Sequence, residues 1–379
     1  MLTDILLLYF LGFGTLLLSG FIGLVIFRFQ NRNIFILVFL GYLAIISTYA
    51  FIKAGGNSVA LFVIIWIVGY IFIIKKQGKF SLIKKRNYLQ YLISISILWT
   101  VIFILKASYF WNLEYNSPNL LFNDYAFYMK VAEGYNLTGN ENALGLRNML
   151  FPFLNFSQPY RSNDIWLVSL GLDLTKIDTI YIWELFYSTI SIFICALSLF
   201  VILKRKFNFL WSLTFSILVL FAFSGSWYRE IINLIYSPNP GSYDPIGIIA
   251  YTKLAIVFAI FFNFFYKYER EEKEEAIYFL ILIPLLVQSG IAVIPTIFFI
   301  ILICIYQEGK FSKNAFKKYL PLIATFTFLI GGFLLFYILN QQKEQLYMGF
   351  SNMDISNNES FIYFINQFYY LSLTIGSVF

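Results

Sequence analysis

The sequence has no histidine, only two cysteines and few charged residues, and each shortage excludes a class of function. Without histidine the chain cannot hold a Ser-His triad or a His-ligated metal site, and it lacks the commonest general base. Cys195 and Cys304 both lie inside apolar runs, so they predict neither a disulfide framework nor a metal site. Any proton transfer therefore falls to carboxylate, tyrosine or lysine side chains.

Charged residues make up 12% of the chain and apolar residues 60%, proportions that exclude an ordinary soluble domain. Residues 6–27 and 35–51 are almost continuously apolar, whereas the strands of a membrane barrel would alternate apolar and polar residues. We therefore expect an all-α fold: a polytopic transmembrane helical bundle of about 8–10 spans or part-spans, with the lipid bilayer as its surroundings.

A membrane helix needs about 20 apolar residues, and this length sets the expected spans. They fall at 4–27, 34–52, 58–74, 88–107, 180–203, 209–226, 246–266 and 319–339. Residues 276–306 are too few for two full spans, so either a hairpin of two short helices or one tilted helix fits there. The sequence ends inside an apolar stretch, 361–379, as a fragment of a longer chain would.

The net charge of +7 is explained by basic residues gathered on one side of the membrane, and it does not require a nucleic-acid partner. Of the 27 Lys and Arg residues, 18 fall in five clusters, at 28–32, 75–86, 204–206, 267–273 and 310–318. The clusters alternate with loops poor in basic residues, which is the positive-inside pattern. The pattern predicts a multi-pass protein of the bacterial inner (cytoplasmic) membrane, with the amino terminus and the long loop outside.

The chain is expected to have three regions. Residues 1–107 form an N-terminal four-helix transmembrane region, and residues 180–379 form a C-terminal transmembrane region. Between them, residues 108–179 form a mostly polar extracytoplasmic loop with short amphipathic helices. Chemistry at a water-accessible surface has few other places in this chain, so the candidate site is expected in the loop.

Asp124 is the leading candidate in that loop. It opens a stretch in which tyrosines recur at helical spacing up to Tyr135, which predicts an amphipathic helix over 124–135. An aspartate at a helix start is a favoured cap, stabilised by the helix dipole. The carboxylate is therefore either a structural cap or a general base held at the boundary between lipid and water.

The chain resembles the GT-C superfamily of integral-membrane glycosyltransferases. The resemblance rests on a hydrophobic span, an outward loop with an early aspartate, an amphipathic tyrosine-rich helix and many further spans. It implies transfer of a sugar from a polyprenyl-phosphate-linked donor to a lipid, glycan or protein acceptor. In that superfamily an acidic loop residue deprotonates or orients the acceptor, a role that passes by resemblance to Asp124. A second acidic motif is common, and Asp164 and Arg229-Glu230 are its candidates here.

Such a reaction needs cations near the departing lipid phosphate. Lys253 lies within the expected span 246–266, where a charge is costly enough to indicate a function, although it could also snorkel to the interface. Arg229 is a second candidate because arginine binds phosphate in a bidentate manner. Glu184 lies just inside the span 180–203, where a carboxylate usually has a partner, and it could face the same outer cavity as Lys253.

Two further residues are candidates for substrate binding. Arg161 either pairs with Asp164 within the loop or contacts the acceptor, and Tyr128 could stack on a sugar, although most aromatic residues near span ends are interface anchors. The proposed chemistry needs no nucleotide-binding loop, and the sequence assigns no cofactor. A divalent cation bound by Asp124 and Asp164 stays open, but two carboxylates so far apart in sequence do not assign one.

Three other functions stay open. A polymerase of the O-antigen type also has many spans and a large outer loop, but it depends on outward arginines, which are few here. A transporter or flippase of lipid-linked glycans would show matched broken helices in two halves, and only 276–306 has such a break. A membrane scaffold without catalytic activity is the third.

Overall fold

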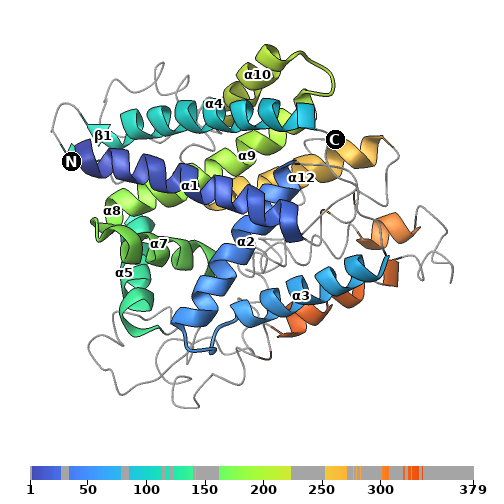
Figure 1. Cartoon of the computed structure of the whole chain (residues 1–379), viewed down its shortest axis with the longest axis horizontal. Helices are drawn as coiled ribbons and strands as arrows, with labels where there is room; N and C mark the ends of the chain where they lie inside the picture. The colour runs from blue at the N-terminus through green and yellow to red at the C-terminus, as the bar shows by residue number, and fades with distance from the viewer. Residues whose placement is uncertain are drawn as a thin grey trace, which may run out of the picture. The chain divides into compact units, whose positions relative to one another are not determined.

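A computed structural model of the whole chain gives its fold (Figure 1). It describes residues 2–26, 34–77, 85–112, 117–118, 123–139, 141, 162–222, 252–270, 276, 279, 282, 301–306, 319–320, 323–325, 327–332 and 335. By contact, the chain divides into Met1–Tyr337 and Ile338–Phe379. All the described residues belong to the first unit.

The described elements are almost entirely helical. They are α1 (Leu2–Ile26), α2 (Ile34–Lys53), α3 (Ala60–Gln77), α4 (Lys85–Phe110), α5 (Asn123–Thr138), α7 (Ser162–Thr175), α8 (Thr179–Tyr181), the π-helical η1 (Ile182–Tyr187), α9 (Ser188–Leu203), α10 (Phe209–Ala222) and α12 (Thr252–Glu269). One antiparallel pair of two-residue strands, β1 (Trp111–Asn112) and β2 (Ser117–Pro118), follows α4. The all-α prediction is confirmed, and each span expected before residue 270 overlaps a helix.

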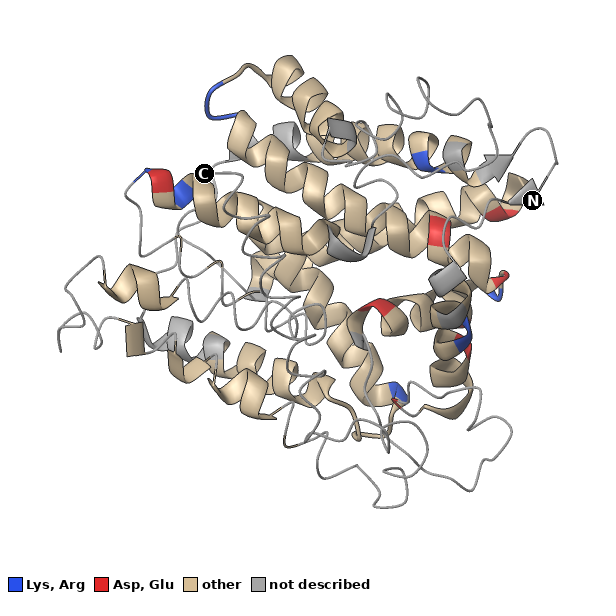
Figure 2. Ribbon diagram, turned by 180° about the vertical axis from the view of Figure 1, so that it is seen from behind, with Lys and Arg blue, Asp and Glu red and all other residues tan. Residues whose placement is uncertain are grey.

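Three helices in the described part of the chain are long and apolar enough to cross a membrane: Leu2–Val25, Ile34–Lys53 and Thr179–Leu203. Shorter apolar helices lie at 60–69, 92–108 and 209–220. Few charged residues interrupt these helices, as Figure 2 shows. The expectation of apolar, membrane-compatible helices is therefore confirmed. Most of 276–306, where a hairpin or a tilted helix was expected, lies outside the described residues.

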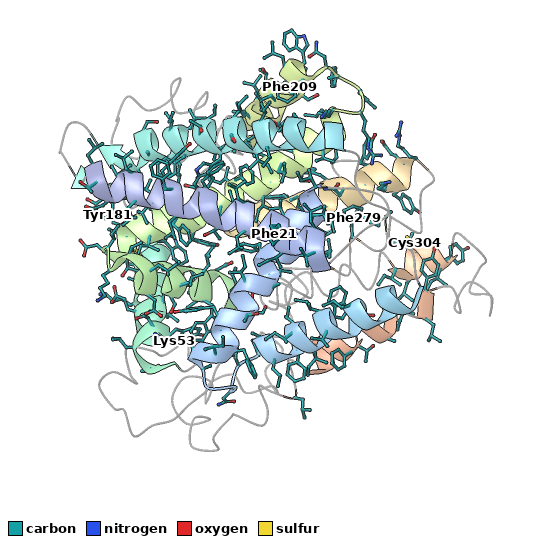
Figure 3. The ribbon with its side chains drawn as sticks, in the orientation of Figure 1. Phe21, Lys53, Tyr181, Phe209, Phe279 and Cys304 are labelled. Carbon is teal, nitrogen blue, oxygen red and sulfur yellow. The ribbon has the colours of Figure 1, made fainter. Side chains whose placement is uncertain are left out.

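The first two helices pack closely because small residues lie where they meet. A Cβ atom on Gly23 of α1 would overlap the backbone carbonyl of Leu37, and a Cβ atom on Gly41 of α2 would overlap the carbonyl of Ser19. Such close approach of backbones is the usual use of small residues between membrane helices. The outer side of α1 is apolar and exposed, at Phe10 (64%) and Phe21 (62%), as suits a surface against lipid (Figure 3).

The continuous segment α8–η1–α9 is the central helix. Its most apolar window is 89% buried, compared with 22% for α1. It contacts α1, α2, α4, α7, α10 and α12. An apolar helix that is buried on all sides belongs in the core of a bundle. The residues of this segment therefore lie where several helices meet, and Glu184 is among them.

Helices α5 and α7 pack against the ends of the apolar helices. Gly139 ends α5 with a φ of +68°, and a Cβ there would lie 2.5 Å from the carbonyl oxygen of Lys53 at the end of α2. The expected helix over 124–135 is confirmed by α5. The first half of α7 differs from the amphipathic helix expected of this loop, because residues 163–169 are all buried. The reason is that α7 packs against α2, α5 and η1.

Candidate functional site

Asp124, the predicted catalytic carboxylate, is the second residue of α5. Its side chain lies outside the described residues, so its roles as a helix cap or as a general base both stay predictions. The backbone of α5 does place Asp124 one turn before Tyr128. The position of Asp124 is therefore set by what holds Tyr128.

Tyr128 joins α5 to the central helix. Its ring stacks on the ring of Trp183 in η1, with the ring centroids 5.7 Å apart and the planes at 17°. Tyr128 is only 5% exposed. Its contact with a sugar stays a prediction, while its packing on Trp183 gives it a structural role that the sequence did not indicate.

Beside Trp183, Glu184 forms an ion pair with Lys106 near the end of α4. The Lys106 Nζ atom lies 2.6 Å from Glu184 Oε2, and the two side chains are 1% and 0% exposed. The contact is an ion pair without the alignment of a hydrogen bond, and the Glu184 carboxylate has no hydrogen-bond partner among the described residues. The expectation that Glu184 has a partner is met by Lys106, which the sequence analysis did not single out.

Glu184 belongs to the π-helical stretch η1, which runs from Ile182 to Tyr187 between two α-helical segments. Such a stretch widens the turn and rotates its side chains relative to a regular α-helix, and it occurs often at functional sites. Here it brings Trp183 onto Tyr128 of α5 and Glu184 onto Lys106 of α4. Nothing in the sequence of 182–187 predicted it.

Helix α12 runs parallel to α9, and this direction fixes the depth of Lys253. The Asn263 side chain donates to Ser198 Oγ, and further along both helices the Arg205 guanidinium lies 5.4 Å from the ring centre of Tyr266. Lys253 precedes Asn263 by as many residues as Ser188 precedes Ser198, about 15 Å in a helix. Lys253, in the first turn of α12, is therefore level with Ser188, one turn from Glu184. The side chain of Lys253 lies outside the described residues.

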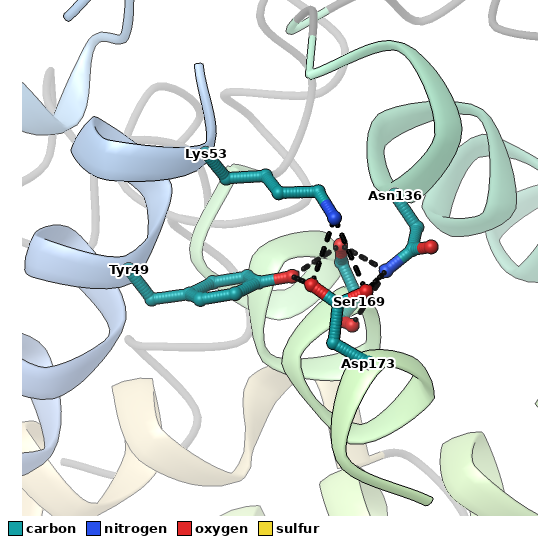
Figure 4. Close-up of polar contacts among 5 residues, drawn as sticks. All are labelled: Tyr49, Lys53, Asn136, Ser169 and Asp173. Carbon is teal, nitrogen blue, oxygen red and sulfur yellow. Dashed lines mark hydrogen bonds and ion pairs between the residues drawn. The ribbon is translucent and has the colours of Figure 1, made fainter. Parts of the chain in front are cut away.

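A polar cluster joins α2, α5 and α7 where α2 ends (Figure 4). Lys53 Nζ lies 2.8 Å from Asp173 Oδ2, the Tyr49 hydroxyl donates to the same oxygen at 2.7 Å, and Asn136 Nδ2 donates to Asp173 Oδ1 at 2.8 Å. Asn136 also donates to the carbonyl oxygen of Ser169 at 3.0 Å. Partial burial raises the pKa of the Asp173 carboxyl, but the donors from Lys53, Tyr49 and Asn136 outweigh it, so that pKa is lowered overall.

Glu141 is a second carboxylate at this end of the helices, and it is fully buried. It accepts hydrogen bonds from the Ser58 hydroxyl (2.6 Å), the Val59 backbone N–H (2.7 Å) and Trp166 Nε1 (2.7 Å). It thereby caps the start of α3 and ties it to α7, although it is distant in sequence from both contacts. Burial raises the pKa of this carboxyl, against the lowering effect of the three donors.

Glu133 ties α5 to the start of the central helix. The Thr179 hydroxyl donates to Glu133 Oε1 at 2.6 Å, and Lys130 Nζ lies 2.7 Å from Oε2. The ring of Tyr181, labelled in Figure 3, also meets Phe110 edge to face with centroids 5.4 Å apart. The end of α2, the end of α4 and the start of α8 therefore lie on one side of the bundle, together with α5 and α7.

The remaining predicted residues are placed only in part. Asp164 is buried in the first turn of α7, with 8% of its surface exposed. Arg161, expected to pair with it, and Arg229, expected to bind phosphate, both lie outside the described residues. Where the structure describes the chain, no three His, Cys, Asp or Glu residues gather as metal ligands. A cation held by Asp124 and Asp164 stays a prediction.

Sequence reasoning overlooked Lys106, Glu141 and Asp173. For Lys106 a signal was present, since it lies near the loop end of one apolar run as Glu184 lies near the loop end of another. Two opposite charges at similar depth indicate a pair. Glu141 and Asp173 had no such signal, because their partners Ser58 and Lys53 are far away in the sequence.

Comparison of the chain with protein-family models, with curated proteins and with solved structures finds no match. The assignment of a function therefore depends on the arrangement of these residues.

Proposed function

We propose that this chain is a glycosyltransferase of the cytoplasmic membrane, acting on the outer face where α5 and α7 lie. It would transfer a sugar from a polyprenyl-phosphate-linked donor to a lipid, glycan or protein acceptor. One observation carries the proposal: Tyr128 of α5 stacks on Trp183, and the next residue, Glu184, forms a buried ion pair with Lys106. These contacts hold α5, which begins at Asn123-Asp124, against the central helix.

The first support is the position of Asp124 relative to the apolar helices. Tyr128 is buried against the central helix five residues into the segment Thr179–Leu203, so the start of α5 lies near the end of an apolar span. A carboxylate there can meet an acceptor hydroxyl from water and a donor whose polyprenyl chain stays in lipid. Asp124 would take the proton of the acceptor hydroxyl while the oxygen of that hydroxyl attacks the sugar and the lipid phosphate departs.

The second support is the fixed roles of the other carboxylates. Glu133, Glu141, Asp173 and Glu184 each bind a cation, a hydroxyl or a backbone N–H of another element, and so hold the helices together. These contacts make the four carboxylates parts of the framework around α5. For Asp124 and Asp164 a direct role in the reaction stays the prediction made from the sequence.

The third support is the cation near the same depth. Lys253 is in the first turn of α12, at about the level of Glu184 in η1, the segment that precedes the parallel helix α9. As the bond between sugar and lipid phosphate breaks, negative charge develops on the phosphate, and a nearby cation stabilises it. The lipid phosphate is itself the leaving group of the donor, so the protein needs mainly to position the donor and the acceptor.

The test is a comparison of glycans by mass spectrometry in source cells that lack the gene, and in the same cells complemented with the wild-type gene. The proposal expects a defined surface glycan to disappear on deletion, while its polyprenyl-phosphate-linked sugar accumulates. Accumulation of lipid-linked glycan only on the cytoplasmic side would instead indicate a flippase. Shortened chains of an otherwise complete repeat would indicate a polymerase, and unchanged glycans would contradict the proposal.

A further inference from the structure

Helix α5 contacts the central helix at a second place, beyond the stack of Tyr128 on Trp183. The Thr179 hydroxyl, at the start of α8, donates to Glu133 Oε1 at 2.6 Å. Thr179 is 7% exposed, so the contact is buried on the side of the central helix. Figure 1 shows α5 beside α8, where the central helix begins. The two contacts together determine how α5 lies against this end of the central helix.

The two contacts hold different sides of α5. Tyr128 and Glu133 are five residues apart, which in an α-helix turns their side chains about 140° from each other. A helix that is held to its neighbour through one side can still turn about its own axis. Contacts on two sides remove that freedom. The bond between Thr179 and Glu133 therefore adds a restraint that the aromatic stack alone does not provide.

The Thr179 hydroxyl bonds to another element instead of its own helix. Threonine hydroxyls often bond to backbone groups close in sequence, as Thr175 does by donating to the Gly171 carbonyl oxygen at 2.8 Å. Thr179 instead donates to a carboxylate 46 residues away. A hydrogen bond to an ionised acceptor is roughly twice as strong as a neutral one. The direction of this hydroxyl therefore favours a role in holding α5.

The other oxygen of Glu133 is held within α5 itself. Lys130 Nζ lies 2.7 Å from Glu133 Oε2, and the Lys130 side chain is 56% exposed. An exposed ion pair of this kind contributes little to stability. It restrains the Glu133 side chain without attaching α5 to any other helix. The attachment to the central helix therefore depends on the buried hydroxyl of Thr179.

The rotation of α5 determines where Asp124 lies around the helix. Asn136 also holds α5 to α7, so loss of the Thr179 contact should let α5 turn slightly without releasing it. The outer atoms of a helical side chain lie about 5–6 Å from the axis, so a rotation of about 20° moves them by about 2 Å. A misplacement of about 1 Å can cost a hundredfold in rate. A small rotation of α5 is therefore enough to impair a proton transfer at Asp124.

We propose that Thr179 and Glu133 are positioning residues of the proposed glycosyltransferase. Their hydrogen bond fixes the rotation of α5, and with it the place of Asp124, without contact between either residue and the substrates. The inference rests on the proposed function, because it assigns the two residues to the reaction in which Asp124 is the base. A purely structural hydrogen bond would contribute to stability alone, and the experiment separates the two roles.

The test measures sugar transfer by the full chain in phosphatidylcholine vesicles. The donor is the lipid-linked sugar that accumulates in cells lacking the gene, and the cell-envelope fraction of those cells is the source of the acceptor. Thr179→Val keeps the shape of the side chain and removes its hydroxyl, whereas Thr179→Ser keeps the hydroxyl. Thr179→Val should lower kcat about tenfold or more and leave the KM for the donor within about twofold of the wild type. Thr179→Ser should keep most of kcat.

Thr175→Val is the matched control. It also removes one threonine hydroxyl near the start of the central helix, but the bond that this hydroxyl donates lies within α7. We expect Thr175→Val and Thr179→Val to lower the unfolding temperature by similar amounts, with kcat unchanged in Thr175→Val. An equal loss of kcat in both variants would reduce the Thr179 contact to a stabilising one and overturn the positioning role.

Glu133 gives a second set of variants from the other side of the hydrogen bond. Glu133→Ala should lower kcat as Thr179→Val does, and the double variant should lose no more than Glu133→Ala alone, because both changes remove the same bond. Glu133→Gln keeps an oxygen that accepts the bond and should keep most of kcat. Additive losses from the two single variants would show that the residues act separately, which contradicts the proposal.

The outcomes distinguish this inference from the proposed function. A wild type that transfers no sugar contradicts the proposed function, and the positioning role with it. An active wild type and a Thr179→Val variant with the same kcat contradict the positioning role alone. Hydrogen exchange of the α5 amides checks the attachment without activity, and it should be faster in Thr179→Val than in Thr175→Val. If Thr179→Val does not fold, Glu133→Ala takes its place in both measurements, and wild-type values for it overturn the proposal.

Discussion

Lys106 of α4 and Glu184 of η1 form an ion pair, 2.6 Å between Nζ and Oε2, at a place where both side chains are excluded from solvent. Glu184 follows Trp183 in the chain, and the ring of Trp183 stacks on the ring of Tyr128 in α5. Two charges are costly in such a place unless each compensates the other. The pair therefore fixes the register between α4 and the central helix at the end of the bundle where Asp124 lies.

Removing one partner of this pair should destabilise the protein strongly. Lys106→Met or Glu184→Leu leaves one uncompensated buried charge, with an expected cost of about 3–5 kcal/mol. The double change Lys106→Met with Glu184→Leu should cost clearly less than the two single changes added together. Unfolding of the purified variants gives the coupling free energy. Single variants as stable as the wild type would show that the two charges do not interact.

The close packing of α1 and α2 predicts opposite results at two glycines. Gly41→Ala places a Cβ atom against the backbone carbonyl of Ser19, so the helices must separate. We expect a loss of about 1–3 kcal/mol. Gly14→Ala, in the same helix pair, meets no atom within 4 Å and should be neutral or stabilising by up to about 1 kcal/mol. Equal effects of the two changes on thermal unfolding would refute the close contact.

The Asp173 cluster predicts a loss of stability in acid. The pKa of the folded carboxyl is below its ordinary value of 3.8, so the unfolded chain binds a proton first as the pH falls. The stabilisation is therefore complete above 3.8 and disappears as the pH falls through the lowered value. Asp173→Asn should remove this dependence and cost about 1 kcal/mol near neutral pH. The measurement is denaturant unfolding between pH 5 and 3, and parallel curves for the two proteins would contradict it.

Glu141 predicts the opposite dependence. Burial raises the pKa of the folded carboxyl above 4.5, so the folded protein binds the proton first as the pH falls. The stability contributed by that proton is complete below 4.5 and disappears as the pH rises through the raised value. Glu141→Gln does not titrate, so the wild type should gain stability relative to it between pH 7 and 4.5. A constant difference between the two proteins would exclude this titration.

The helices could be predicted from the sequence because they depend on local properties. Long apolar runs such as those of α1, α2 and α9 form helices in a membrane whatever their neighbours are, since the backbone must satisfy its own hydrogen bonds there. The tyrosine spacing after Asp124 likewise predicted α5. The three regions 1–107, 108–179 and 180–379 stay predictions, because the contact-based division falls at residue 337 and does not test them.

The contacts around the candidate site could not be predicted in the same way. Lys106 and Glu184 meet only because α4 packs on the central helix and η1 turns Glu184 toward it. Glu141 caps α3 from far along the chain. Such partners depend on tertiary register, which a single sequence does not give. For the same reason the sequence places α7 in a polar loop, although the first half of this helix is buried against other helices.

The central claim is that Asp124 is the acceptor base of a membrane glycosyltransferase, and one comparison tests it most directly. Wild type, Asp124→Asn and Asp178→Asn are purified and placed in phosphatidylcholine vesicles. They are supplied with the lipid-linked sugar that accumulates in cells lacking the gene, as donor, and with the cell-envelope fraction of those cells, as the source of the unmodified acceptor. Asp178 is a suitable control because it is exposed in the same loop and makes no capping hydrogen bond. The measured quantity is the polyprenyl phosphate released together with the transferred sugar.

We expect wild type and Asp178→Asn to transfer sugar at similar rates, and Asp124→Asn to lose at least about a hundredfold, as for a removed general base. All three proteins should unfold at similar temperatures. Transfer by Asp124→Asn at the wild-type rate would reduce Asp124 to a helix cap and contradict the assignment.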